Sequence, residues 1–344
     1  MHGDEIAARA PVAINARAAV RREIGGVERW ARELSARLPQ LRPNRYAVLK
    51  PPPRFAYGAG QAWEQLALPL AARGSALLVS PANMAPLASR RNVVVIHDVA
   101  PFHEPDWFGR AYVTWHRALL PRLARRARLV ICPSEFVRDE LVELFGLDQA
   151  RVVAIAPGVG DERADPPAPE LVLARLGLEQ PYVLALGTDS PRKNLSLLDR
   201  IAPRLAEAGL GVAIAGSGRS YLRASARGSA RRLGYIADAH LSALYAGAAA
   251  FAMPSLYEGF GLPCLEAMAA GTPVVAADRA ALPEACGGAA LLVDPDDAEA
   301  FATALIRAAG PERGRLTEAG RARAAGLSWA RSAESVDAAI GALL

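Results

Sequence analysis

Short apolar runs alternate with segments of helical periodicity along the whole chain. In the first half, the apolar runs predict strands at residues 12–14, 46–49, 77–80, 93–96, 129–132 and 152–155. Between the first two runs, Trp30, Leu34 and Leu38 recur every four residues and predict a helix over 27–38. Helices are also predicted at 112–125 and 135–145. Strands that alternate with helices favour a parallel sheet covered by helices.

The second half repeats this alternation after a proline-rich break at residues 157–169. Its predicted strands are 182–186, 211–215, 249–253, 273–276 and 290–293. A chain of 344 residues also exceeds the size of a single comfortable core. We therefore predict an α/β protein of two doubly wound domains, residues 1–165 and 170–328. Such sheets bind ligands outside the carboxyl ends of their strands.

The composition of the chain limits the kinds of protein that it can be. A hydrophobic fraction of 52% belongs to a globular chain. The three cysteines, Cys132, Cys264 and Cys286, lack metal-ligand or redox spacing and are expected to be reduced core residues. No signal-peptide pattern follows Met1, and no apolar run is long enough to span a bilayer. We expect a cytoplasmic protein.

The charge of the chain is uneven. Residues 1–165 hold 23 Arg and Lys against 17 Asp and Glu, or +6, and the remaining 17 against 18 give −1. A basic first half favours an anionic partner, such as the inner membrane surface or a polyprenyl-phosphate carrier, although a merely solvated basic face explains it as well. Nucleic acid is not expected, because no motif that binds it occurs.

The most informative segment is Ser255–Ala276, in which Glu258 and Glu266 are separated by seven residues. Pro263 suits the first turn of a helix and Gly271 the position just past its end, so Glu258 lies in a loop and Glu266 in the helix. Backbone N–H groups at Gly261, Leu262 and Cys264 would then face a ligand. A helix N-terminus favours phosphate, so this layout predicts a nucleotide-diphosphate site.

Further candidates follow the other predicted strands. Arg192-Lys193 comes after strand 182–186 and can neutralise a departing diphosphate. His97, Gly216 and Gly218 are further candidates at the ends of predicted strands. Gly26, just before the helix predicted at 27–38, and Tyr235, before another predicted helix, are candidates as well. The acidic run Asp294–Asp297 resembles a metal site, but its place before a helix favours capping instead. We expect no metal.

These motifs resemble those of the family 4 retaining glycosyltransferases. The match covers Glu258-Gly259-Phe260-Gly261-Leu262-Pro263, with Glu266 completing the E-x7-E signature, and Arg192-Lys193-Asn194-Leu195. The resemblance implies the GT-B fold, in which two Rossmann-like domains face each other across a cleft. It also implies that the last helix, around residues 329–344, packs back on the first domain.

The resemblance also implies roles for individual residues. Arg192 and Lys193 would stabilise the leaving diphosphate, Glu258 and His97 would contact the transferred sugar, and Glu266 would hold the ribose. Donor binding is further implied for Gly26, Gly216, Gly218, Tyr235, Gly259, Phe260, Gly261 and Leu262. The family requires neither metal nor cofactor, because the nucleotide sugar is a co-substrate.

The expected activity is retaining hexosyl transfer to a glycan or lipid-linked acceptor in surface polysaccharide synthesis. The segment around His97-Asp98 resembles members that use GDP-mannose, so mannose is the expected sugar. A UDP-, ADP- or dTDP-sugar donor and a nucleotide-sugar epimerase remain alternatives. A dehydrogenase is disfavoured because Gly25-Gly26 does not provide the dinucleotide fingerprint.

Overall fold

The computed structural model of the chain describes residues 11–21, 24–55, 60–160, 169–216 and 230–344. They form two compact units. The first contains residues up to Val99, Thr114–Pro157 and Trp329–Leu344, and the second contains Ala100–Val113 and Gly158–Ser328. The assignment of 100–113 to the second unit differs from the predicted boundary at 165. In that segment the centroid of the His103 ring lies 5.9 Å from that of the Tyr257 ring, which is also part of the second unit.

The sheet of the first unit has six parallel strands in the order β2-β1-β3-β4-β5-β6. These are β1 (Val12–Asn15), β2 (Tyr46–Leu49), β3 (Leu77–Ser80), β4 (Asn92–Val95), β5 (Leu129–Cys132) and β6 (Val152–Ala154). Four of the strands are buried along their whole length, as expected of parallel strands with both faces covered. The six predicted strands of the first half are confirmed.

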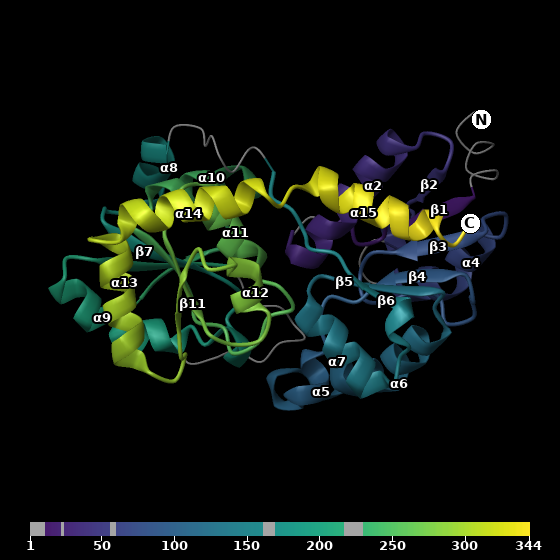
Figure 1. Cartoon of the computed structure of the whole chain (residues 1–344), viewed down its shortest axis with the longest axis horizontal. Coiled ribbons are helices and arrows are strands. Elements are labelled where there is room, and N and C mark those ends of the chain that lie inside the picture. The colour runs from purple at the N-terminus through teal and green to yellow at the C-terminus, as the bar shows by residue number, and fades with distance from the viewer. Residues whose placement is uncertain (1–10, 22–23, 56–59, 161–168, 217–229) are drawn as a thin grey trace. The chain divides into compact units, whose positions relative to one another are not determined.

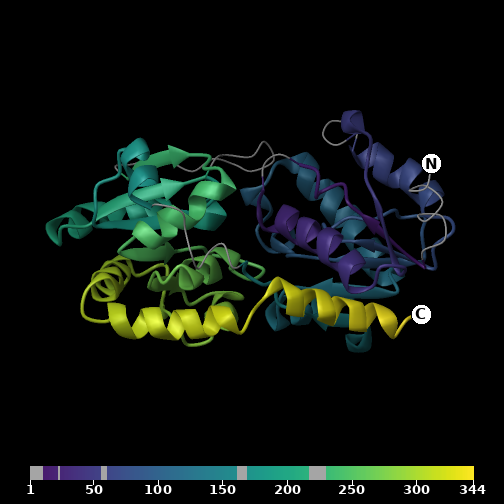
Figure 2. The ribbon, with the colours of Figure 1, turned by 90° about the horizontal axis from the view of Figure 1, so that it is seen from above.

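Helices cover this sheet (Figures 1 and 2). They are α2 (Gly26–Leu41), α3 (Gly60–Ala62), the π-helical turn η2 (Trp63–Ala67), α4 (Leu68–Ala71), α6 (Arg110–Arg126), α7 (Glu135–Phe145) and α15 (Trp329–Gly341). Short 3₁₀ turns occur at η1 (Pro53–Phe55) and η4 (Gln149–Arg151). The helical run at 60–71 was not predicted, because its apolar residues show no clear period.

The last helix, α15, packs against α2. The rings of Trp30 and Trp329 meet edge to face at 5.8 Å between centroids, and both side chains are buried. Asp337 accepts hydrogen bonds from the Tyr46 hydroxyl at 2.7 Å, from Arg45 Nη1 at 2.8 Å and from Arg42 Nε at 3.2 Å. Helix α15 is therefore held on the first unit by an apolar contact between two tryptophans and by hydrogen bonds to the Asp337 carboxylate.

The second unit has its own parallel sheet, in the order β12-β11-β10-β7-β8-β9. The strands are β7 (Tyr182–Leu186), β8 (Gly211–Ala215), β9 (Arg231–Gly234), β10 (Ala250–Met253), β11 (Val274–Ala277) and β12 (Leu291–Val293). Five of the six were predicted. The missed strand, β9, contains two arginines and a glycine, so it lacks the apolar run that identified the others.

The remaining helices belong mainly to this second unit. They are α5 (Ala100–His103), η3 (Pro105–Trp107), α8 (Pro169–Leu176), η6 (Pro191–Lys193), α9 (Ser196–Glu207), α10 (Asp238–Gly247), α11 (Leu262–Ala269), α12 (Leu282–Cys286), α13 (Ala298–Ala309) and α14 (Arg313–Ala325). Helices α9 and α13 bury leucines and phenylalanine against the sheet. Within the described ranges, no helix is both long and apolar enough to cross a membrane. All three cysteines are buried, and none of them forms a disulfide.

Candidate active site

In the second sheet, the order in which successive strands are added changes direction between β7 and β10. From β7 the chain adds β8 and β9 on one side, and then returns to place β10, β11 and β12 on the other. Ligands of open α/β sheets bind outside the carboxyl ends of the strands at such a switch point. Arg192 and Lys193 follow β7, and Glu258 follows β10. The topology therefore explains how residues about 65 positions apart become neighbours.

The three side chains form one buried ion cluster. Lys193 Nζ donates to Glu258 Oε1 at 2.6 Å, and Arg192 Nη1 donates to Glu258 Oε2 at 3.0 Å. The same Arg192 nitrogen donates to the Tyr257 carbonyl, also at 3.0 Å. Lys193 and Glu258 are each only 8% exposed. The charges are thus held in fixed positions at the switch point of the sheet.

The electrostatics of the cluster favour an ionised carboxylate. Burial acts to raise the pKa of Glu258, but the charges of Arg192 and Lys193 outweigh it and lower that pKa to about 2. Burial lowers the pKa of Lys193, with Arg192 adding to this effect and Glu258 opposing it. Glu258 therefore remains charged throughout the physiological range. An additional anion at this site would in turn favour the charged form of Lys193.

Two glycines allow the chain to approach closely around the cluster. A side chain at Gly216, which has φ +132°, would place its Cβ 2.0 Å from the carbonyl oxygen of Gly187. A Cβ at Gly187 would lie 3.2 Å from the aliphatic stem of Lys193. Gly216 therefore does bring backbone close, but to the loop that carries the lysine. The other predicted glycine of this turn, Gly218, lies outside the described residues.

The loop before α11 has the predicted form. Gly261 is the N-cap residue with φ +117°, Pro263 lies in the first turn, and Gly271 follows the helix with φ +79°. The expectation of a free Cys264 N–H is wrong, because that group donates to the Gly261 carbonyl at 2.9 Å. The tight turn made possible by Gly261 explains this bond. Phe260 and Leu262 are buried, and Gly259 belongs to the same loop.

Glu266 is buried on α11 and accepts a hydrogen bond from the Tyr245 hydroxyl at 2.9 Å. Tyr245 is fully buried on α10, and it fixes the orientation of this carboxylate. Tyr245 was not predicted as a site residue, because nothing in the sequence distinguishes it from an ordinary core aromatic residue. The other predicted donor residue of this region, Tyr235, follows β9 and is 46% exposed.

Two predicted site residues lie in the first unit. Gly26 begins α2, and a Cβ there would meet no atom within 4 Å, so the fold itself does not require glycine. His97 lies just after β4, where its Nε2 bonds the Pro81 carbonyl at 2.9 Å and its ring meets the edge of Trp30. Since a carbonyl oxygen only accepts, Nε2 is the donor in this bond, and burial lowers the pKa of His97.

The acidic residues after β12, Asp294, Asp296 and Asp297, have structural roles. Asp297 caps α13 by accepting from the Ala300 N–H at 2.9 Å. Asp294 and Asp296 both accept from Arg279 Nη2, at 3.2 and 2.8 Å. Within the described part of the chain, no group of three or more His, Cys, Asp or Glu residues is arranged to hold a metal ion.

Comparison with known proteins identifies the family of the chain. Residues 24–163 match the family model described as Glycosyltransferase Family 4, and residues 180–310 match the model described as Glycosyl transferases group 1. The chain is 32% identical to the O-antigen chain mannosyltransferase B of Escherichia coli over 255 residues, which cover 70% of this chain and 67% of that protein.

A more distant relative is the O-antigen chain mannosyltransferase RfbU of Salmonella typhimurium, 26% identical over 63% of this chain and 60% of that one. The chain spans between about half and two thirds of the length of the curated relatives it matches. Among solved structures, the Anabaena protein Alr3699/HepE in complex with UDP and glucose matches with a TM-score of 0.73. That match covers 97% of this chain and all of the other at 16% identity, and it shows a shared GT-B fold.

Proposed function

The chain belongs to the family 4 glycosyltransferases, and we propose that it transfers mannose from GDP-mannose, with retention of configuration, to a glycan or lipid-linked acceptor. The observation that carries this proposal is the buried cluster of Arg192, Lys193 and Glu258 at the switch point of the second sheet. The choice of mannose is supported by the relatives named as O-antigen mannosyltransferases.

In the proposed mechanism, Arg192 and Lys193 stabilise the diphosphate as it leaves. They are fixed before the reaction by Glu258, so they need little reorganisation when negative charge develops. Two cations in these positions can supply the charge that a divalent ion supplies elsewhere, and we propose that transfer needs no metal or other cofactor. The N-terminus of α11 at Gly261 and Leu262 adds a positive dipole on the same side.

Glu258 orients the cations and contacts the sugar. Each carboxylate oxygen has two lone pairs, so both can accept from the cations and still accept a sugar hydroxyl. We do not assign Glu258 as a covalent nucleophile, since the paired cations hold its charge. We propose that the acceptor attacks from the face that the phosphate leaves, and that the diphosphate takes the proton. Glu266, oriented by Tyr245, would accept from the ribose hydroxyls.

A UDP-sugar donor is the second candidate. The structural neighbour from Anabaena contains UDP and glucose, but it shares only 16% identity with this chain. The mannosyltransferase B relative shares 32%, and we therefore give the mannosyl donor precedence.

Thermal shift of the purified chain against GDP, UDP, ADP, dTDP and NAD, each at about 1 mM without added metal, tests the donor. A ligand at about 100 times its Kd stabilises the folded state by about 2.7 kcal/mol, or several degrees. We expect a shift with GDP that exceeds the others. A larger shift with UDP would replace the donor, and a shift with NAD alone would contradict the glycosyltransferase mechanism.

We further propose that the chain acts at the inner face of the cytoplasmic membrane, where a lipid-linked acceptor would be available. Leu66 and Leu70, four residues apart, are 71% and 70% exposed, and the exposed Arg73 follows them. Exposed leucines beside a cation suit insertion among anionic headgroups.

Replacement of both Leu66 and Leu70 by Ser should weaken sedimentation with vesicles that contain phosphatidylglycerol by about tenfold or more, because each buried leucine contributes about 1.5–3 kcal/mol. Leu171 of α8, which is 65% exposed, provides the matched control. If Leu171→Ser has the same effect as the double variant, or if neither changes vesicle binding, the membrane proposal is wrong.

A further inference from the structure

The loop that follows β3 lies against His97. Strands β3 and β4 are parallel neighbours in the first sheet, so their carboxyl ends meet at the same edge. The loop, residues 81–84, comes directly after Ser80 at the end of β3, and His97 is the second residue after β4. The order of the strands therefore explains how Asn83 of this loop reaches His97 from 14 positions away.

Two hydrogen bonds join the loop to His97. The His97 backbone N–H donates to Asn83 Oδ1 at 2.7 Å, and the ring nitrogen Nε2 donates to the Pro81 carbonyl at 2.9 Å. A third bond, from the Asn83 N–H to the Val95 carbonyl at 2.8 Å, ties the loop to the end of β4. The backbone and the imidazole of His97 are thus both held by one short loop.

Asn83 meets two requirements of this loop at once. Its φ of +59° lies in the left-handed region, which is unfavourable for most residues with a Cβ and in which Asn and Asp are enriched. Glycine would adopt this conformation more easily, but it has no side-chain acceptor. Asn83 therefore supplies both the backbone conformation of the loop and the oxygen that holds the His97 N–H.

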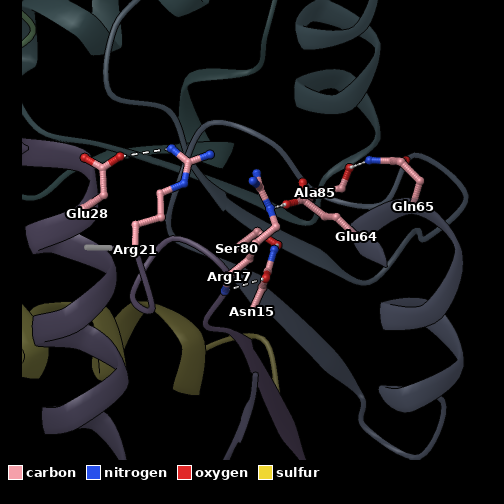
Figure 3. Close-up of polar contacts among 8 residues, drawn as sticks. All are labelled: Asn15, Arg17, Arg21, Glu28, Glu64, Gln65, Ser80 and Ala85. Carbon is pink, nitrogen blue, oxygen red and sulfur yellow. Dashed lines mark hydrogen bonds and ion pairs between the residues drawn. The ribbon is translucent and has the colours of Figure 1, made fainter. Parts of the chain in front are cut away.

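Contacts on both sides of the loop keep it in place (Figure 3). Just before the loop, Asn15 Nδ2 donates to Ser80 Oγ at 3.4 Å. Just after it, Gln65 Nε2 donates to the Ala85 carbonyl at 3.0 Å, and Gln65 Oε1 accepts from the Leu87 N–H at 3.0 Å. Residues 81–84 are thus fixed at both ends, which limits how far they can move away from His97.

The bond to Pro81 selects one tautomer of the His97 ring. A carbonyl oxygen only accepts, so Nε2 carries a proton. Burial lowers the pKa of His97 below its ordinary value of about 6.5, so the ring is neutral at pH 8 and has a single N–H. The other nitrogen, Nδ1, therefore carries a lone pair. The edge-to-face contact with Trp30, at 5.7 Å between ring centroids, further restricts the ring.

A ring held in this way can accept a hydrogen bond from a ligand through Nδ1, because its only N–H is already used. We infer that Asn83 is a positioning residue, which keeps the loop on His97 so that Nδ1 stays the acceptor for a hydroxyl group of the transferred sugar. The inference rests on the proposed function, since only a chain that binds a sugar nucleotide offers His97 such a hydroxyl. If the loop released Nε2, the proton could move to Nδ1, and that atom would no longer accept.

NMR of the chain labelled with ¹⁵N-histidine tests the tautomer directly. At pH 8, long-range ¹H–¹⁵N correlations distinguish the protonated ring nitrogen from the unprotonated one. The chain has five histidines, and the His97 signals are those that disappear in His97→Gln. We expect the proton on Nε2 in the parent and a mixture of both tautomers in Asn83→Gly. A parent ring protonated on Nδ1 would overturn the inference, whether or not Asn83→Gly folds.

Kinetics test whether the position of the ring matters. Asn83→Gly suits the left-handed conformation and removes only the acceptor. Release of GDP from GDP-mannose should fall about tenfold, because a misplacement of about 1 Å can cost as much as 100-fold. The thermal shift with GDP should not change, because GDP lacks the sugar. Asn83→Asp, which restores an acceptor oxygen, should recover most of the rate. Asn44→Gly, in an exposed turn of the same unit, is the matched control.

A double variant separates positioning from a general effect on stability. If Asn83 acts through His97, Asn83→Gly combined with His97→Gln should be no slower than His97→Gln alone, since coupled residues are not additive. The inference is overturned if the two effects multiply, if His97→Gln alone keeps the parent rate, or if Asn83→Gly keeps the parent rate and tautomer. A parent chain that does not bind GDP would instead contradict the proposed donor, and its tautomer would still test the role of the loop.

Discussion

Glu258→Gln is expected to lower transfer by about 100-fold or more while GDP affinity changes by only a few fold. The variant removes the charge that holds Lys193 at 2.6 Å and Arg192 at 3.0 Å, so both cations lose the orientation that suits a departing diphosphate. Loss of one preorganised electrostatic contact typically costs about 100-fold in rate. Release of GDP from GDP-mannose measures the rate, and thermal shift with GDP measures binding.

The control for this variant is Glu207→Gln, which removes an exposed carboxylate 3.6 Å from Arg204 in the same unit. Melting curves of both variants are required, because loss of one partner of a buried ion pair can cost about 3–5 kcal/mol of stability. A folded Glu258→Gln variant that releases GDP at the parent rate would show that the cluster is purely structural. Because the Glu258 pKa is near 2, its own titration should not limit activity above about pH 4.

Asp337→Ala should lower the melting temperature by roughly 5–10 °C. Asp337 is 5% exposed and accepts from Tyr46, Arg45 and Arg42, so its removal leaves the buried Tyr46 hydroxyl without its acceptor. Hydrogen bonds to charged groups are worth about 1.5–3 kcal/mol, which corresponds to a shift of this size in a domain of 150 residues or more. Differential scanning calorimetry measures the effect, and Glu334→Ala, on the exposed side of the same helix, is the control.

The Asp337 contribution should depend on pH. Although burial opposes the shift, hydrogen bonds from Tyr46 and Arg42 and the charge of Arg45 lower the Asp337 pKa below its usual value. A carboxylate with a depressed pKa stabilises the fold above its unfolded pKa of about 3.9, and this contribution is lost as the pH falls through the folded value. The difference between parent and Asp337→Ala should therefore narrow from pH 7 toward about pH 3. A constant difference would assign the effect to packing.

The strands could be predicted because a buried parallel strand requires an uninterrupted apolar run, and eleven such runs stand out in the sequence. β9 could not, because Arg231 and Arg232 interrupt the apolar run, and their hydrogen-bond partners become neighbours only in the folded chain. Arg231 donates to the Leu176 and Gly177 carbonyls, and Arg232 to Asp199. The helical run at 60–71 was missed for a different reason. Its π-helical turn disrupts the spacing of apolar residues that is typical of an α-helix.

The candidate site could be predicted where its functional residues lie close together in the sequence. Arg192-Lys193 and the segment from Glu258 to Glu266 each combine unusual residues with a strand end. Their direct pairing was not predictable, because it depends on which strands become neighbours at the switch point. Tyr245 carries no local signal at all. It gains its role only when the folded chain brings Glu266 to it.

The first unit is assembled from segments on both sides of the second in the sequence, since α15 packs on α2. During synthesis the ribosome therefore releases every residue of the second unit before the first can close. Until Trp329 and Asp337 emerge, Trp30 and Tyr46 remain uncovered on a nascent domain. A ribosome stalled before residue 329 would thus hold a complete second unit attached to an unfinished first one, and a chaperone that binds exposed aromatic surface should associate with it.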